Sequence, residues 1–156
     1  MDKNQLREDS VNFAIAVSDV CDGVKGCSVF VNQLVRASSS IGANIHEARY
    51  AQSRADFISK LEIALKESSE TDYWLELLFR KGKLTEVQYK TLRNQCGAIR
   101  RRLISSITTT VFIFKVFYFE KIANILVTVI AALYFNISSN LSVLISAVCN
   151  EFKVIF

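Results

Sequence analysis

Residues Arg36–Tyr50 read RASSSIGANIHEARY, and this stretch decides the fold. Small side chains fill its first half, and apolar residues recur at helical steps of seven, four and three along Leu34, Ile41, Ile45 and Ala48. That spacing places them on one stripe of a helix. Small residues beside the stripe allow another helix to approach closely, which predicts the central helix of a bundle. Because a buried amide needs hydrogen-bond partners, we expect Asn44 to fix how a neighbouring helix sits.

Composition favours one helical domain. The 156 residues include no proline and only five glycines, fewer turn formers than an all-β domain needs. The net charge of +4 permits contact with nucleic acid or anionic membranes without requiring it. The charged start MDKNQLREDS is not expected to be a secretory signal. Scattered single cysteines without a CxxC pair predict a reduced, cytoplasmic location: Cys21, Cys27, Cys96 and Cys149.

Three more amphipathic segments accompany the central one. Helices are expected over about 5–24, over 28–51, after Ser53 and after Thr85. The third has the most regular heptad spacing, along Phe57, Leu61, Ala64, Ser68, Thr71, Leu75 and Leu78. Such spacing is typical of nearly antiparallel packing. The fourth carries Tyr89, Leu92, Cys96, Ile99 and Leu103. Short connections then predict an all-α, antiparallel up-down-up-down four-helix bundle.

Local signals support these boundaries. Ser53 with Asp56, and Thr85 with Gln88, have the spacing of capping boxes, and Gly82 suits a left-handed position after the third helix. The predicted core includes Leu61, Leu65, Leu75, Ile41, Ile45, Leu92 and Leu103.

Composition changes sharply near Ile107. The last arginine is Arg102, and seven of the eleven phenylalanines follow Ile107. We therefore divide the chain into a bundle, 1–107, and an apolar tail, 108–156. Three interpretations of the tail stay open: a membrane segment within 122–148, where two apolar runs would form a hairpin; extra helices packed on the bundle; or a non-native read-through with the composition of translated AT-rich DNA.

The two central helices resemble a known family. Residues 33–78 read QLVRASSSIGANIHEARYAQSRADFISKLEIALKESSETDYWLELL. They are similar to the small four-helix-bundle proteins encoded within intervening sequences of bacterial 23S ribosomal RNA genes, whose helices follow QLxRAxxSIxxNIxEA and FIxxLxIALKExxETxYWLxLL. The resemblance covers roughly 1–107 and implies a bundle with no cofactor and no established active site. The tail matches nothing in this pattern.

The family includes the accessory variability protein of diversity-generating retroelements, a basic pentameric barrel. That relationship implies a homo-oligomer, with RNA or DNA and a protein such as a reverse transcriptase as partners. Among the residues of the family motif, Glu47 and Glu70 are expected to pair with Arg36 or Arg49 between helices. Trp74, next to Tyr73, is expected in the core or at a subunit interface rather than as a base-stacking platform.

No catalytic or metal-binding residue is predicted. His46-Glu47 begins like an HExxH zinc motif, but Tyr50 stands where the second histidine would be. The carboxylates of the third helix are expected to be a solvated face or partners of arginines.

The fourth helix carries the candidate nucleic-acid-binding residues: Lys90, Arg93, Arg100, Arg101 and Arg102. They face few carboxylates, Glu86 being the only one in that helix, so the sector is expected to neutralise phosphates without reading bases. An ordinary solvated helix face explains the same composition equally well. The leading function is therefore a non-enzymatic, oligomeric bundle that contacts RNA or DNA. The alternatives are a protein-interaction scaffold and a membrane-anchored bundle.

Overall fold

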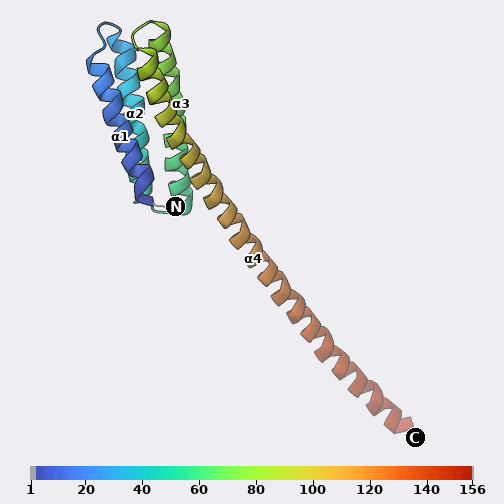
Figure 1. Cartoon of the computed structure of the whole chain (residues 1–156). Helices are drawn as coiled ribbons and strands as arrows, with labels where there is room; N and C mark the ends of the chain where they lie inside the picture. The colour runs from blue at the N-terminus through green and yellow to red at the C-terminus, as the bar shows by residue number, and fades with distance from the viewer. Residues whose placement is uncertain (1–2, 156) are drawn as a thin grey trace. The chain divides into compact units, whose positions relative to one another are not determined.

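The computed structural model contains four helices: α1 Lys3–Asp22, α2 Ser28–Ala48, α3 Arg54–Arg80 and α4 Glu86–Ile155 (Figure 1). It describes the backbone of residues 3–155 and the side chains of 5–131 and 133–135. The chain divides into two compact units, 1–111 and 112–156. The first unit holds α1, α2, α3 and the start of α4.

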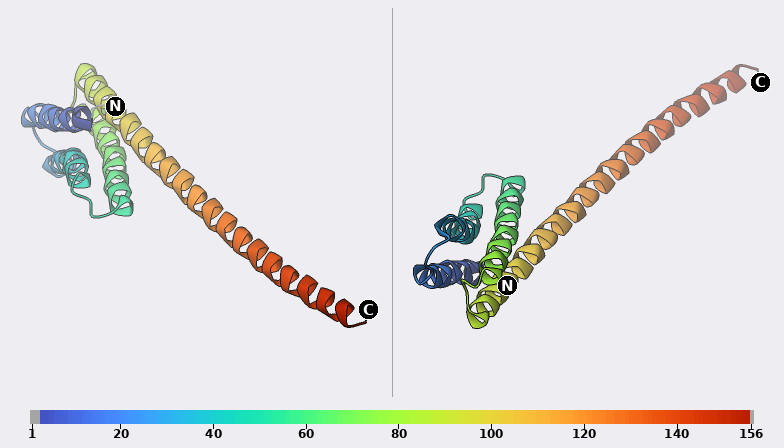
Figure 2. Two further views of the ribbon diagram at one scale, coloured as in Figure 1. Left: turned by 90° about the horizontal axis from the view of Figure 1, so that it is seen from below. Right: turned by 90° about the horizontal axis from the view of Figure 1, so that it is seen from above.

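Short connections make successive helices antiparallel, as predicted. Residues 23–27, 49–53 and 81–85 join the helices, and Figure 2 shows the first two connections from further sides. The all-α four-helix bundle expected from sequence is confirmed. α1 begins and ends two residues earlier than predicted, and α2 ends at Ala48 rather than Ala51.

Hydrogen bonds explain where the helices begin and end. Gln88 N–H donates to Thr85 Oγ at 3.2 Å and Thr85 N–H to Gln88 Oε1 at 2.9 Å, a complete capping box. Asp56 N–H donates to Ser53 Oγ at 3.1 Å, but the Asp56 carboxylate accepts from Gln52 N–H instead of closing the box on Ser53. After α3, Gly82 has φ of 65° and forms the expected left-handed turn.

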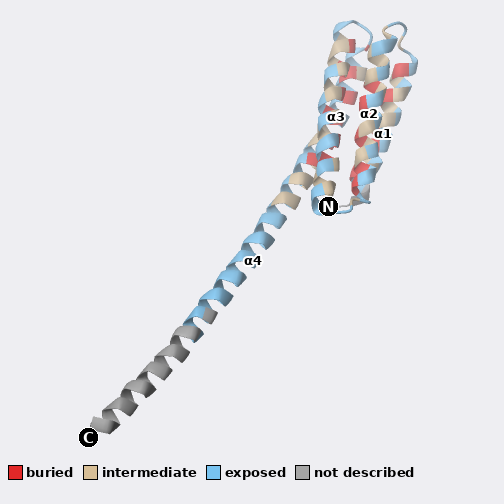
Figure 3. Cartoon of the chain, turned by 180° about the vertical axis from the view of Figure 1, so that it is seen from behind, coloured by how far each residue is buried: buried red, intermediate tan, exposed pale blue. Residues whose placement is uncertain are grey.

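The core of the bundle lies along the four predicted stripes. Figure 3 shows the buried residues on the facing sides of the helices. The largest fully buried apolar side chains are Phe13, Val17, Leu34, Ile41, Leu75, Leu78, Leu92, Ile99 and Leu103. Six of the seven predicted core residues are buried, whereas Leu65 is only partly buried. Leu65 follows the buried Ala64, and one residue turns a helix by about 100° away from the core.

α1 and α2 approach closely at Gly42. A β-carbon there would lie 3.4 Å from Ser10 Oγ, and Ser10 is fully buried. Small residues at this contact therefore set the distance between the two helices, as the stretch Arg36–Tyr50 predicted.

The second unit is a single run of helix. α4 continues without a turn through 136–141, so the hairpin considered for the tail does not form. From Phe112 to Phe135 every described side chain is exposed, and most are apolar (Figure 3). The side chains of the second apolar run, 141–148, lie outside the described residues.

Shortening a buried side chain of α3 should destabilise the bundle more than shortening an exposed side chain of the same helix. Leu61 is 3% exposed, so Leu61→Ala should lower the free energy of unfolding of the bundle by about 2–5 kcal/mol. Ile63 on the same helix is 39% exposed, so Ile63→Ala should cost well under half of that. Denaturant melts of both variants measure the difference, and equal losses would show that the stripe is misassigned.

Candidate functional site

The basic residues of α4 lie against carboxylates of other helices. Arg93 Nε lies 3.2 Å from Asp72 Oδ1, and Arg100 Nη2 lies 3.5 Å from Asp72 Oδ2. Asp72 belongs to α3, so one carboxylate receives two arginines that are about two turns apart on α4. The sequence of α4 alone does not indicate Asp72 as a partner of these arginines, because Asp72 lies on another helix.

Arg100 also binds the backbone of α3 directly. Its Nη2 donates to the Ser68 carbonyl at 2.9 Å, and its Nε donates to Ser68 Oγ at 3.3 Å. The Cys96 thiol donates to the same carbonyl at 3.3 Å. Ser68 is fully buried, and 30% of the Arg100 side chain is exposed. We call Ser68, Asp72, Arg93, Cys96 and Arg100 the α3–α4 seam.

Two more of the candidate cations also have partners. Arg102 Nη1 is ion-paired with Asp9 Oδ2 of α1, and Lys90 Nζ lies 2.5 Å from Glu86 Oε1 one turn earlier. Arg101 is exposed and, among the described residues, has no ion pair. The sequence analysis considered only the carboxylate on the same helix, Glu86. The structure adds Asp72 of α3 and Asp9 of α1 as partners, which the spacing on α4 does not show.

The family-motif residues make a second cluster, on α2 and α3. Glu70 Oε1 accepts from Arg36 Nη2 at 2.5 Å and from Trp74 Nε1 at 3.2 Å. These two bonds, that of Trp74 first, lower the pKa of Glu70. Trp74 in turn stacks on Phe30, with ring centroids 5.9 Å apart. The predicted pairing of Arg36 with Glu70 is present, and the cluster joins α2 to α3.

Two other motif residues behave differently from the prediction. Glu47 pairs with Lys60 at 2.6 Å, not with Arg36 or Arg49, because Lys60 lies near the end of the second turn of the antiparallel helix α3 beside it. Asn44 Nδ2 donates to the Ser40 carbonyl of its own helix at 2.9 Å. The Asn44 amide is therefore hydrogen-bonded within α2, and this bond does not position a neighbouring helix as predicted.

His46 and the buried cysteines are the residues that metal or thiol chemistry would use. His46 lies against Tyr50, with ring centroids 5.5 Å apart, and no group of three His, Cys, Asp or Glu side chains comes together among the residues described. Burial raises the pKa of Cys21 and of Cys96 to about 11, so both thiols are protonated at neutral pH.

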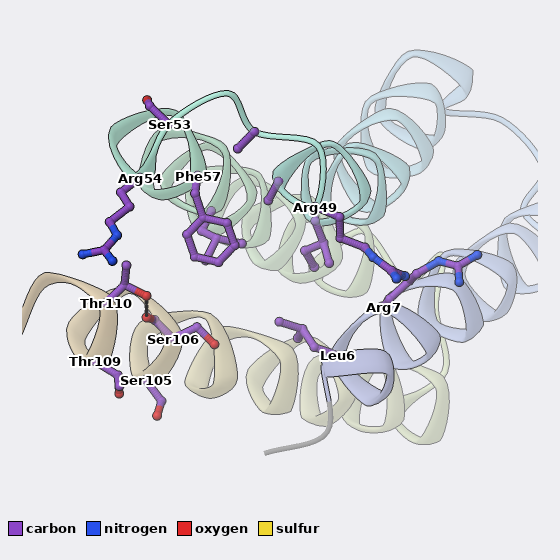
Figure 4. Close-up of a pocket in the computed structure, with 14 residues that line it drawn as sticks. Leu6, Arg7, Arg49, Ser53, Arg54, Phe57, Ser105, Ser106, Thr109 and Thr110 are labelled. Carbon is purple, nitrogen blue, oxygen red and sulfur yellow. Dashed lines mark hydrogen bonds between the residues drawn. The ribbon is translucent and has the colours of Figure 1, made fainter. Parts of the chain in front are cut away.

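A pocket that the sequence analysis did not predict lies at the end of the bundle where α2 meets α3 (Figure 4). Its volume is about 850 Å³. Apolar side chains, hydroxyls and arginines line it together. The sequence feature that could have indicated this pocket is the pair Ser106 and Thr110. They occupy the next two positions of the α4 stripe after Leu103.

Comparison with known proteins identifies the family. The model of the 23S rRNA-intervening sequence protein family matches residues 2–105. The chain belongs to this family. A solved structure from Bacteroides thetaiotaomicron VPI-5482, described as a protein with unknown function from the S23 ribosomal protein family, is 44% identical, with a TM-score of 0.66. No curated protein matches the chain.

The match to the Bacteroides structure also delimits the bundle. It covers 99% of that chain and 69% of this one, and the family model ends at residue 105. The relative therefore consists almost wholly of the intervening-sequence bundle. Residues 1–111 form a compact unit of this chain, and the experiments below on the bundle therefore use these residues.

The α3–α4 seam predicts that replacing Arg100 destabilises the bundle and that replacing its neighbour Arg101 does not. Arg100→Ser removes three interactions with α3 and should lower the free energy of unfolding by about 1–3 kcal/mol, since part of the side chain is hydrated. Arg101→Ser should change it by about 0.5 kcal/mol or less. Thermal melts of residues 1–111 carrying each change provide the measurement. Indistinguishable melting temperatures would contradict the seam.

Proposed function

We propose that this member of the intervening-sequence family is a non-enzymatic helical bundle held at a membrane by the C-terminal part of α4. The observation that carries the proposal is the exposed apolar surface of the second unit. Within the described residues, one helix is long and apolar enough to cross a membrane, with a mean hydropathy of 1.8 and none of the window buried. A core helix of a soluble protein passes the same composition test but is mostly buried.

Continuity of the helix supplies the length. Residues 122–150 contain no Asp, Glu, Lys or Arg, and α4 runs through all of them. A span needs about 20 residues, so this segment is long enough even with its polar Asn and Ser side chains. The apolar run 122–135 is too short to span a membrane by itself, but α4 continues beyond it.

Flanking charges favour one orientation. Lys115 and Lys121 precede the uncharged segment, and Arg100–Arg102 come within about one span length of it, whereas the next six residues, 151–156, contain one basic residue, Lys153. Cytoplasmic flanks of spanning helices are enriched in Lys and Arg. The bundle is then cytoplasmic, in agreement with the reduced thiols expected for that compartment.

Membrane attachment should depend on the apolar character of α4. The full chain should stay with membranes after a carbonate wash, and residues 1–111 should be soluble. Ile130→Arg with Leu133→Arg places two charges on positions 58% and 57% exposed, each costing about 2.5–3.5 kcal/mol near the centre of a span, and should release the full chain from the pellet.

The matched control is Val87→Arg, which adds a charge at a 74% exposed position of α4 within the bundle and should leave fractionation unchanged. Extraction of the parent chain by carbonate, or retention of the double variant, would contradict membrane insertion.

Contact with RNA or DNA is the second candidate function. For this function we propose a contact surface at one end of the bundle, in place of the basic residues of α4. Lys83 Nζ donates to the Lys25 carbonyl at 3.0 Å, so the α1–α2 and α3–α4 connections meet. Lys81, in the α3–α4 connection with Lys83, has its Nζ 5.6 Å from the centroid of the Phe30 ring of α2. Lysines 25, 81 and 83 thus belong to two connections that meet, while most cations of α4 have partners.

Self-association would strengthen such contact by repeating the lysines. Tyr73 is 58% exposed and packs edge-on against Trp74, with centroids 4.9 Å apart, an aromatic surface that a second subunit could cover. Light scattering on residues 1–111 should then give a mass above the monomer.

Salt dependence tests nucleic-acid contact. Binding of residues 1–111 to single-stranded RNA should weaken with salt, by a slope of about −0.7 per neutralised phosphate. Changing Lys25, Lys81 and Lys83 together to Gln should flatten that slope. Changing Lys60, Arg80 and Lys90 to Gln removes three ion-paired charges and should not. Absence of binding even at low salt would exclude this second candidate.

A further inference from the structure

The pocket at the end of the bundle is built entirely within residues 1–111. The start of α1, the end of α2, the α2–α3 connection, the start of α3 and residues 105–110 of α4 enclose it. Its apolar wall consists of Leu6, Ile45, Ala48, Ala51, Phe57 and Leu61. At about 850 Å³ it falls within the size range of small-molecule sites.

The space exists because α4 presents small polar residues where its stripe predicts large apolar ones. Steps of three and four from Leu103, which is fully buried, lead to Ser106 and Thr110. Both line the pocket, with Ser105 and Thr109 beside them. A leucine at either position would fill this end of the core as Leu92 and Leu103 fill its middle. The small side chains thus leave volume. Thr110 Oγ1 donates to the Ser106 carbonyl at 2.8 Å, so its hydroxyl offers a ligand an acceptor only.

Three arginines line this space, two of them on one side of it. Arg7 is partly buried and Arg49 is exposed, and both line the pocket. In the part of the chain with described side chains, neither guanidinium has an ion pair, in contrast to Arg36, Arg93, Arg100 and Arg102. Figure 4 shows their side chains extending on the side away from Phe57. Arg54 also lines the pocket, and no described carboxylate does.

We propose that this pocket binds a single-chain amphiphile with an anionic head group, a phosphate monoester or a carboxylate. The alkyl chain lies on Leu6, Ile45, Phe57 and Leu61, and the head group lies between Arg7 and Arg49. Guanidinium groups bind both oxyanions through paired N–H donors. A second copy of the chain fits less well, because each copy has a net charge of +4 and the pocket needs negative charge.

This proposal goes beyond membrane attachment and does not depend on it, so the test uses residues 1–111 with monomeric ligands. Calorimetry with lauroyl lysophosphatidate, monolauroyl glycerol and glycerol phosphate compares the complete amphiphile with its uncharged and chainless parts. The lysophosphatidate should bind, the monolauroyl glycerol should bind at least about tenfold more weakly, and glycerol phosphate should bind weakest.

Two variants locate the site. Arg7→Gln with Arg49→Gln should weaken lysophosphatidate about tenfold or more and leave monolauroyl glycerol unchanged, whereas Lys25→Gln with Arg101→Gln, which removes the same charge elsewhere, should alter neither. Ser106→Leu should weaken both lipids and raise the melting temperature, because it fills the pocket. A free headgroup phosphate as ligand would appear as equal binding of glycerol phosphate, and a second copy as a dimer that Ser106→Leu disrupts. Either result, or unchanged binding by the Arg7/Arg49 variant, overturns the proposal.

Discussion

The bundle depends on how closely α4 lies on α3 at Ser68. Ser68, Thr71 and Cys96 are fully buried and small, so the two backbones come near enough for Arg100 and Cys96 to reach one helical carbonyl. That carbonyl already belongs to the hydrogen-bond ladder of α3, and it accepts further donors because a carbonyl oxygen has two lone pairs. Asp72, one turn later, neutralises the arginines that this approach brings in.

This contact decides which charges remain for binding. Guanidinium groups paired with carboxylates and carbonyls must give up those partners before they can bind phosphate, which costs part of any gain. Among the described residues, several cations form no ion pair: Arg101 on α4, Lys25, Lys81 and Lys83 on the joined connections at one end of the bundle, and Arg7 and Arg49 around the pocket at the other. The apolar surface of α4 beyond Val111 is the other feature that internal packing leaves exposed.

The sequence predicted what is local or periodic. Stripes at steps of three and four identified the core, and the Thr85–Gln88 capping box and Gly82 marked helix ends, because each depends on residues within one or two turns. The motif pairing of Arg36 with Glu70 followed from the family resemblance. The partners of Arg93, Arg100 and Arg102 were not predictable from α4, since they depend on the rotation of α1 and α3 about their own axes. Ser106 and Thr110 were visible at stripe positions, but only the folded bundle shows that nothing else fills the space.

The central claim is that Arg100 is held by α3 while its neighbour Arg101 is not. The most direct measurement is NMR of the arginine Nε–Hε groups in residues 1–111, recorded during a titration with single-stranded RNA at low salt. The Arg100 resonance should exchange slowly with water and keep its position throughout, and any shift should be confined to unpaired side chains such as Arg101. An Arg100 resonance that exchanges as fast as that of Arg101, or moves with it on adding RNA, would contradict the account.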